Sequence, residues 1–186
     1  MTCIVGLEFD GRIWMGCDSA AVGPNMIYPT SLSKVFTVGG ILIGYTSSFR
    51  MGQLLQYKLE VPPHDDGVDD ITYLATSFVD AVRDCLQAGG FATRENEAET
   101  GGNFLVGYHG RLYEVCSDYQ VNSTRRGYMA IGAGEEYALG SLHTTDDHWS
   151  PVQRIVFALQ AAADWNHYVL PPLSVFTDTG EKVCEK

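Results

Sequence analysis

The stretch TCIVGLEFDGRIWMGCDS, residues 2–19, decides the fold. Two runs rich in apolar and β-branched residues, 3–9 and 12–17, flank the dipeptide Asp10-Gly11. Asp-Gly between two such runs is a strong signal for a β-hairpin with a two-residue turn. We therefore expect an antiparallel hairpin at the start of the chain, whose second strand brings Asp18 back beside the first residues.

The rest of the chain alternates between hairpins and helices. Further hairpins are expected at 34–45, around Gly39-Gly40, and at 104–116, around Gly110, with short strands at 128–131 and 173–177. Helical periodicity and end signals mark helices from Ser47-Ser48 to Pro62-Pro63, from Asp70 to Gly89, over 135–142 and from Ser150-Pro151 to about Trp165. The polar stretch 94–102 is expected to be an exposed loop.

Strands that come as hairpins form antiparallel sheets, and each amphipathic helix pair must cover a sheet. Two stacked sheets between two helix layers bury every apolar face. We therefore predict an α+β chain with a four-layer αββα sandwich, as one domain covering residues 1–186. A single α+β sheet is the alternative that the pattern alone leaves open.

Composition excludes several classes of function. The net charge of −11 argues against nonspecific nucleic-acid binding, which needs a basic surface. No apolar run approaches the roughly 20 residues of a membrane span, and no basic segment opens a signal peptide. The five cysteines form no C-x-x-C pair and the five histidines no H-E-x-x-H motif, so we expect no disulfide framework or metal site, and a cytoplasmic location.

Thr2 is the candidate nucleophile. A small second residue permits removal of Met1, which would leave threonine at the N-terminus. A threonine hydroxyl needs a base within hydrogen-bond reach, and an α-amine with a pKa of about 7.7–8.0 can supply one. An N-terminal threonine therefore carries both nucleophile and base, although many proteins begin with Met-Thr for no such reason.

Asp18 and Lys34 are the expected partners of Thr2. The first hairpin returns Asp18 to the neighbourhood of Thr2, and adjacent strand ends can bring Lys34 there as well. A lysine ammonium beside the amine would lower the pKa of the amine by like-charge repulsion, and an aspartate would orient the lysine. The alternative is an ordinary ion pair between two strand ends.

These residues also carry a resemblance to a known family. Residues 2–6, Asp10-Gly11, 16–19 and Lys34-Val35 resemble the start of proteasome β-subunits and of the bacterial HslV peptidase. Asp18 and Lys34 lie 16 and 32 residues after Thr2, the same separations as the catalytic aspartate and lysine of that family. Residues 43–48 resemble the strand before the substrate-binding turn, and 131–140 resemble the Gly-Ser-Gly-x-x-Tyr-Ala segment.

The resemblance implies an N-terminal-nucleophile hydrolase that cuts amide bonds through an acyl-enzyme, without a cofactor and within a ring. It implies catalytic roles for Thr2, Asp18 and Lys34. Ser48 falls where a glycine N–H normally binds the oxyanion, and Thr46 and Ala21 fall among the substrate-binding positions, near Thr30 and Ser31. These substrate-binding side chains are too small and neutral to dictate one specificity.

The sequence departs from the family in the groups that support the α-amine. Ala133 occupies the place of the serine in the Gly-Ser-Gly segment. The family's late aspartate and serine align with Asn166 (or His167) and Val169, and Asp164, Asn166 and His167 are candidate substitutes. The three catalytic residues are thus all present, whereas the polar side chains that would support the α-amine are replaced.

Three functions follow from this balance. The first is a threonine-type endopeptidase acting on peptides or unfolded proteins in a self-compartmentalised homo-oligomeric ring, with room for an ATP-dependent unfoldase as partner. The second is a catalytically weak or inactive assembly subunit, and the third is a small-molecule amidase. The ring would bury apolar helix faces around Leu54, Leu55 and Tyr57.

Overall fold

The computed structural model describes residues 2–95, 98–145 and 148–186. Its strands are β1 (Cys3–Phe9), β2 (Arg12–Cys17), β3 (Ala20–Val22), β4 (Ile27–Pro29), β5 (Val35–Val38), β6 (Ile41–Tyr45), β7 (Thr93–Glu95), β8 (Ala98–Thr100), β9 (Phe104–Tyr108), β10 (Arg111–Val115), β11 (Val121–Ser123), β12 (Tyr128–Gly132), β13 (Ser174–Thr177) and β14 (Lys182–Glu185). Its helices are α1 (Phe49–Tyr57), α2 (Asp70–Tyr73), α3 (Val79–Ala88), α4 (Glu135–Thr144) and α5 (Pro151–Trp165), and a π-helical segment, Leu74–Phe78, joins α2 to α3.

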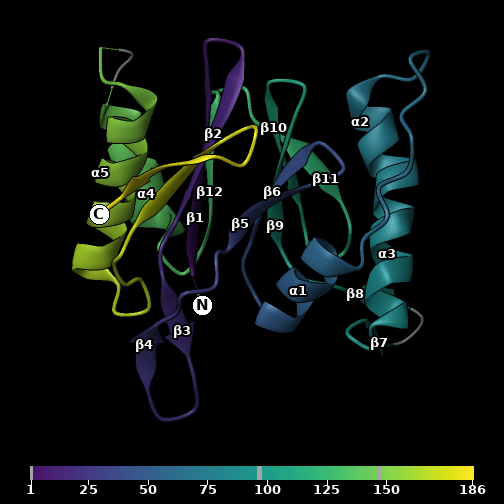
Figure 1. Ribbon diagram of the computed structural model, residues 1–186, viewed down its shortest axis with the longest axis horizontal. Helices are drawn as coiled ribbons and strands as arrows, with labels where there is room; N and C mark the ends of the chain where they lie inside the picture. The colour runs from purple at the N-terminus through teal and green to yellow at the C-terminus, as the bar shows by residue number, and fades with distance from the viewer. Residues whose placement is uncertain (1, 96–97, 146–147) are drawn as a thin grey trace.

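Two antiparallel five-stranded sheets form the centre of the described structure. The first has the strand order β12-β1-β2-β13-β14, and the second has the order β11-β10-β9-β6-β5. Helices α4 and α5 cover the outer face of the first sheet, and α1 and α3 cover the outer face of the second (Figure 1). This is the four-layer αββα sandwich expected from the sequence, and the single-sheet alternative is excluded.

Three separate apolar clusters fill the three interfaces between these layers. Alternate residues of β1 divide between two of them, because successive side chains on a strand point to opposite faces. Val5 packs towards α4 and α5, whereas Ile4 packs between the sheets against residues such as Leu42 of β6. The sheets approach closely there, since a Cβ added at Gly44 would lie 2.4 Å from the sulfur of Met15.

The starts of the helices follow the signals in the sequence, whereas α1 ends at Tyr57, before the expected Pro62-Pro63, because Lys58 at φ −130° already leaves the helical conformation. Ser48 caps α1 by accepting a hydrogen bond from the Arg50 N–H. Ser150 and Gln153 form a capping box at the start of α5, with a proline in the first turn. The second helix differs by one residue, because Asp69 rather than Asp70 accepts from the Thr72 N–H as the N-cap.

Several expectations need correction. The stretch 94–102, expected to be a loop, contains the ends of a small β7–β8 hairpin with Arg94 opposite Glu99. Leu54 and Leu55 are buried in the cluster between α1 and the second sheet, so they are not available to a ring interface, whereas Tyr57 is exposed. None of the helices in the described ranges combines the length and hydropathy that a membrane crossing requires.

Candidate active site

The β1–β2 hairpin returns the chain to its own beginning. Asp10 and Gly11 both have positive φ, 52° and 71°, as a type I′ turn requires, and the paired register runs from Phe9 opposite Arg12 back to Ile4 opposite Cys17. The next residue, Asp18, donates its N–H to the carbonyl oxygen of Cys3 at 3.3 Å. The hairpin predicted from the sequence thus places Asp18 opposite Cys3, the residue that follows Thr2.

The Asp18 carboxylate is buried and fully engaged. Its Oδ1 accepts from the Cys3 N–H at 3.0 Å and from Lys34 Nζ at 2.8 Å. Its Oδ2 accepts from the backbone N–H groups of Ala20 at 2.8 Å and Leu170 at 3.3 Å. The two charged side chains are 0% and 1% exposed. Desolvating an ion costs several kcal/mol, so a pair this deep depends on those four bonds.

The Asp18–Lys34 ion pair joins the two sheets. Asp18 follows β2 of the first sheet, whereas Lys34 precedes β5 of the second, and its carbonyl accepts from the Tyr45 N–H at 3.0 Å. Figure 1 shows the N-terminus beside the start of β5, near the lower ends of the two sheets. The cation is therefore presented to the first residues from the opposite layer of the sandwich.

The Gly132-Ala133-Gly134 segment fixes Thr2 from the other side. Thr2 is 5% exposed, and its carbonyl accepts from the Ala133 N–H at 2.7 Å. Gly132 has φ +98°, and a Cβ there would lie 2.1 Å from the Thr2 carbonyl oxygen. Only glycine fits this conformation and this close approach. The expected removal of Met1 concerns a residue outside the described ranges.

Replacing Gly132 with alanine should therefore lower the free energy of unfolding. We expect a loss on the order of 3 kcal/mol in urea denaturation, from left-handed strain and from overlap with the Thr2 carbonyl. Gly40→Ala is the matched control, because Gly40 has φ +81° and open space around its missing Cβ. Equal losses in the two variants would contradict the steric contact at Thr2.

The positions at which the sequence departs from the pattern it resembles lie beside this segment. Asn166, the C-cap of α5, donates through Nδ2 to the Ala133 carbonyl and accepts from the Tyr168 N–H at 3.0 Å. Val169 is buried in the apolar cluster beneath α5. The other two candidate substitutes have different partners, since Asp164 accepts from Gln160 and the His167 ring lies tilted against the ring of Tyr168. Asn166 thus reaches the site through the backbone of residue 133.

The Ser48 N–H, which the resemblance assigns to oxyanion binding, already has an acceptor. It donates to the Thr46 carbonyl at 2.7 Å across Ser47, which has φ +66°. Thr46 is itself buried, and its hydroxyl donates to the Asn103 carbonyl at 3.0 Å. Ala21 lies buried on β3, opposite Tyr28 of β4. An oxyanion could use the Ser48 N–H only after the turn at Ser47 opened.

Sequence reasoning named Asn166, His167 and Val169 after α5 but missed Leu170, which makes the contacts to Asp18 and Ser19. Ser19 donates to the Leu170 carbonyl through both its N–H, at 2.8 Å, and its hydroxyl, at 3.0 Å. Leu170 in turn donates its N–H to Asp18. These contacts join residues about 150 positions apart and use the backbone of Leu170, so its residue type gives no signal.

The neighbouring thiols do not compete with Thr2 as nucleophiles. Burial, followed by the nearby negative charge of Asp18, raises the pKa of Cys3 far above its ordinary value. Burial likewise raises the pKa of Cys17 to about 12. Because the thiolate is the reactive form, both cysteines remain inert thiols near neutral pH.

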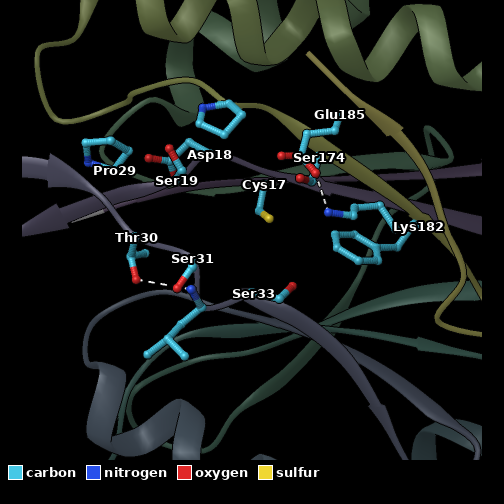
Figure 2. Close-up of a pocket in the computed structure, with 13 residues that line it drawn as sticks. Cys17, Asp18, Ser19, Pro29, Thr30, Ser31, Ser33, Ser174, Lys182 and Glu185 are labelled. Atoms are coloured by element: carbon cyan, nitrogen blue, oxygen red, sulfur yellow. Dashed lines mark hydrogen bonds and ion pairs between the residues drawn. The ribbon is translucent and has the colours of Figure 1, made fainter.

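A cavity of about 330 Å³, lined by both polar and apolar side chains, adjoins Asp18. Figure 2 shows Thr30, Ser31 and Ser33, from the segment between β4 and β5, across the cavity from Ser174 and Lys182 of β13 and β14. Thr30 and Ser31 were expected near the substrate, and both line this cavity. Thr2, Lys34 and Ser48 do not line it, so the cavity borders the trio from the Asp18 side only.

Comparisons with known proteins support the fold. No protein-family model matches the sequence, and no curated protein does. The structure of Thiobacillus denitrificans BPH in complex with epoxomicin is similar, with TM-score 0.75, 18% identity and coverage of 94% of this chain and 97% of that chain. Eukaryotic HslV from Trypanosoma brucei has a TM-score of 0.64 and 14% identity, with coverage of 94% of this chain and 98% of that chain. The helical assembly of Anbu from Pseudomonas aeruginosa has a TM-score of 0.67 and 15% identity, with coverage of 97% of this chain and 86% of that chain. The chain therefore has the proteasome-like fold of HslV and Anbu.

Proposed function

We propose that this protein is a threonine-type peptidase whose nucleophile is Thr2, exposed by removal of Met1. The observation that carries the proposal is the buried Asp18 carboxylate, which hydrogen-bonds both to the Cys3 N–H and to the Lys34 ammonium. This bridge supports a position for a fully buried cation next to the first residues of the chain. Asp18 uses one of the three ammonium protons, and the others remain for the Thr2 hydroxyl and its developing charge.

The proposed reaction proceeds in two halves. The α-amine of Thr2 takes the proton from its own hydroxyl, directly or through water, and the hydroxyl oxygen attacks the peptide carbonyl carbon. The oxyanion intermediate collapses, the C–N bond breaks, and the ammonium returns its proton to the leaving amine. Water, deprotonated by the same amine, then attacks the resulting ester and releases the acid product and Thr2.

Assembly belongs to the same proposal. The Anbu structure from Pseudomonas aeruginosa is described as a helical assembly, and we propose that this chain also works as a homo-oligomer, with peptides or unfolded proteins as substrates. An ATP-dependent unfoldase would feed such an assembly. A monomeric mass in native mass spectrometry of active protein would contradict this part.

Intact mass spectrometry with and without epoxomicin tests the proposal. Epoxomicin suits the test because Thiobacillus denitrificans BPH was solved in complex with it. We expect protein lacking Met1, one adduct per chain, and an adduct mapped by peptide sequencing to Thr2. A retained Met1 in the working protein would exclude the Thr2 mechanism.

A specific observation favours the second candidate function, a weak or inactive assembly subunit. By the resemblance, Ala133 and Val169 stand where proteasome β-subunits have serines, and the Ser48 N–H is bonded to the Thr46 carbonyl. Correctly trimmed, oligomeric protein that forms no adduct would support this candidate over the peptidase.

A further inference from the structure

Three side chains with metal-binding atoms meet at the opposite end of the molecule from Thr2. His64 lies in the connection between α1 and α2, Asp70 is the first residue of α2, and His109 lies in the turn between β9 and β10. One ligand atom from each lies within 4.8 Å of the others. Figure 1 shows α2 and the β9–β10 end of the sheet at the top, whereas the N-terminus lies below.

The distances approach those of a metal centre. Asp70 Oδ1 lies 2.9 Å from His109 Nδ1 and 3.9 Å from His64 Nδ1. Zinc bonds of about 2.0–2.1 Å to nitrogen and oxygen in a tetrahedron separate the ligand atoms by roughly 3.3 Å. Each of these two spacings differs from that value by less than 1 Å, and the ligand atoms of the two histidines lie within 4.8 Å of each other.

The ring of His64 is already oriented as a metal ligand. Its Nε2 lies 2.8 Å from the Val68 carbonyl, which only accepts hydrogen bonds, so Nε2 carries the proton. In the neutral ring, Nδ1 then carries the lone pair and faces Tyr108 Oη and Asp70. The ring also stacks on Tyr73, with centroids 4.2 Å apart. A backbone carbonyl that holds the second nitrogen is the usual support of a metal-bound histidine.

The contact between Asp70 and His109 occupies the place of the ion. A carboxylate accepts hydrogen bonds, so His109 Nδ1 carries the proton between them. An ion entering at this point displaces that proton from Nδ1: a neutral ring takes it up on Nε2, and an imidazolium, which already has a proton on Nε2, releases it to solvent. His109 is exposed, so the ion and a released proton have direct access to solvent.

We propose that His64, Asp70 and His109 form a binding site for a divalent transition-metal ion of the zinc class. Two imidazoles and one carboxylate are ligands that suit zinc, cobalt and nickel rather than magnesium. Three protein ligands leave a coordination position for water. The bound ion ties the α1–α2 connection and the start of α2 to the β9–β10 turn. This site is independent of Thr2 and its chemistry.

Titration of EDTA-treated full-length protein with zinc ions tests this site, with calorimetry and thermal unfolding as readouts. We expect saturable binding of one ion per chain and a Tm that rises with zinc concentration. Losing a second-sphere partner of a metal costs about 10–100-fold in affinity, so loss of a direct ligand in His109→Gln or Asp70→Asn should cost at least ~100-fold. The cap of α2 is kept in Asp70→Asn, because it is Asp69.

Two matched variants separate metal ligation from general histidine or surface effects. His143→Gln removes an exposed histidine on α4 and should bind zinc as wild type does. Tyr108→Phe removes the hydroxyl that occupies His64 Nδ1 and should bind zinc at least as tightly. The proposal is overturned if no saturable binding occurs, if magnesium binds equally well, or if His109→Gln and Asp70→Asn retain wild-type affinity.

Discussion

Thr2→Ala should abolish peptide hydrolysis and epoxomicin labelling while leaving the fold intact. We expect kcat/KM to fall by more than ~10⁴-fold, the scale seen when the nucleophile of a hydrolase triad is removed. Alanine is small enough to permit removal of Met1, so the variant keeps the same processing. Its backbone also keeps the hydrogen bond between residue 2 and the Ala133 N–H. Fluorogenic peptide turnover and adduct mass measure the two effects.

Thr2→Ser is the matched control for that variant. Serine retains the hydroxyl and the α-amine and should form the epoxomicin adduct, although more slowly. Labelling of Thr2→Ala at the wild-type rate would assign the reaction to another residue. Because burial raises the pKa of both Cys3 and Cys17, we would then expect the reacting residue to lie outside this region.

The second large effect concerns the buried ion pair. Lys34→Met keeps most of the volume of the side chain but leaves the Asp18 carboxylate buried without its counter-charge. Breaking a buried pair by removing one partner costs about 3–5 kcal/mol, which for a chain of this size lowers Tm by roughly 10 °C. Chemical denaturation and calorimetry would measure the loss, and activity should disappear even where the variant remains folded.

A double-mutant cycle separates the interaction energy of the Asp18–Lys34 pair from the effect of each substitution alone. Asp18→Asn leaves the ammonium of Lys34 unpaired and should cost a similar free energy. The double variant Lys34→Met/Asp18→Asn should lose less than the two single losses combined, because no unpaired charge remains. Additive losses, or a loss below about 1 kcal/mol in Lys34→Met, would mean that the pair behaves like an exposed ion pair.

The parts of the fold that depend on local signals could be predicted from the sequence. Asp10-Gly11 fixes a turn with two positive φ angles, and Ser48 and Ser150 start helices through their own side chains. Both partners of each of these interactions lie within a few residues of each other, so a short stretch of sequence is enough to predict them. The layers then follow from the need to bury each apolar face, and the three separate clusters confirm that argument.

Features that depend on distant backbone contacts could not be predicted. The short strands β3, β4, β11 and β14 pair for three or four residues and have little periodicity of their own. The Leu170 N–H at Asp18 would be supplied by any residue except proline. His109 reaches Asp70 only because the β9–β10 turn is placed beside α2 by the packing of the second sheet. Sequence spacing showed these histidines as scattered.

The attachment of Asp18 and Lys34 to different sheets affects the order in which the protein becomes reactive. A chain with only the first sheet formed holds Thr2 and Asp18 without the cation, and one with only the second holds Lys34 alone. The proposed chemistry thus requires closure of the sandwich. A nascent copy whose layers have not yet met has no assembled centre with which to cut its unfolded neighbours.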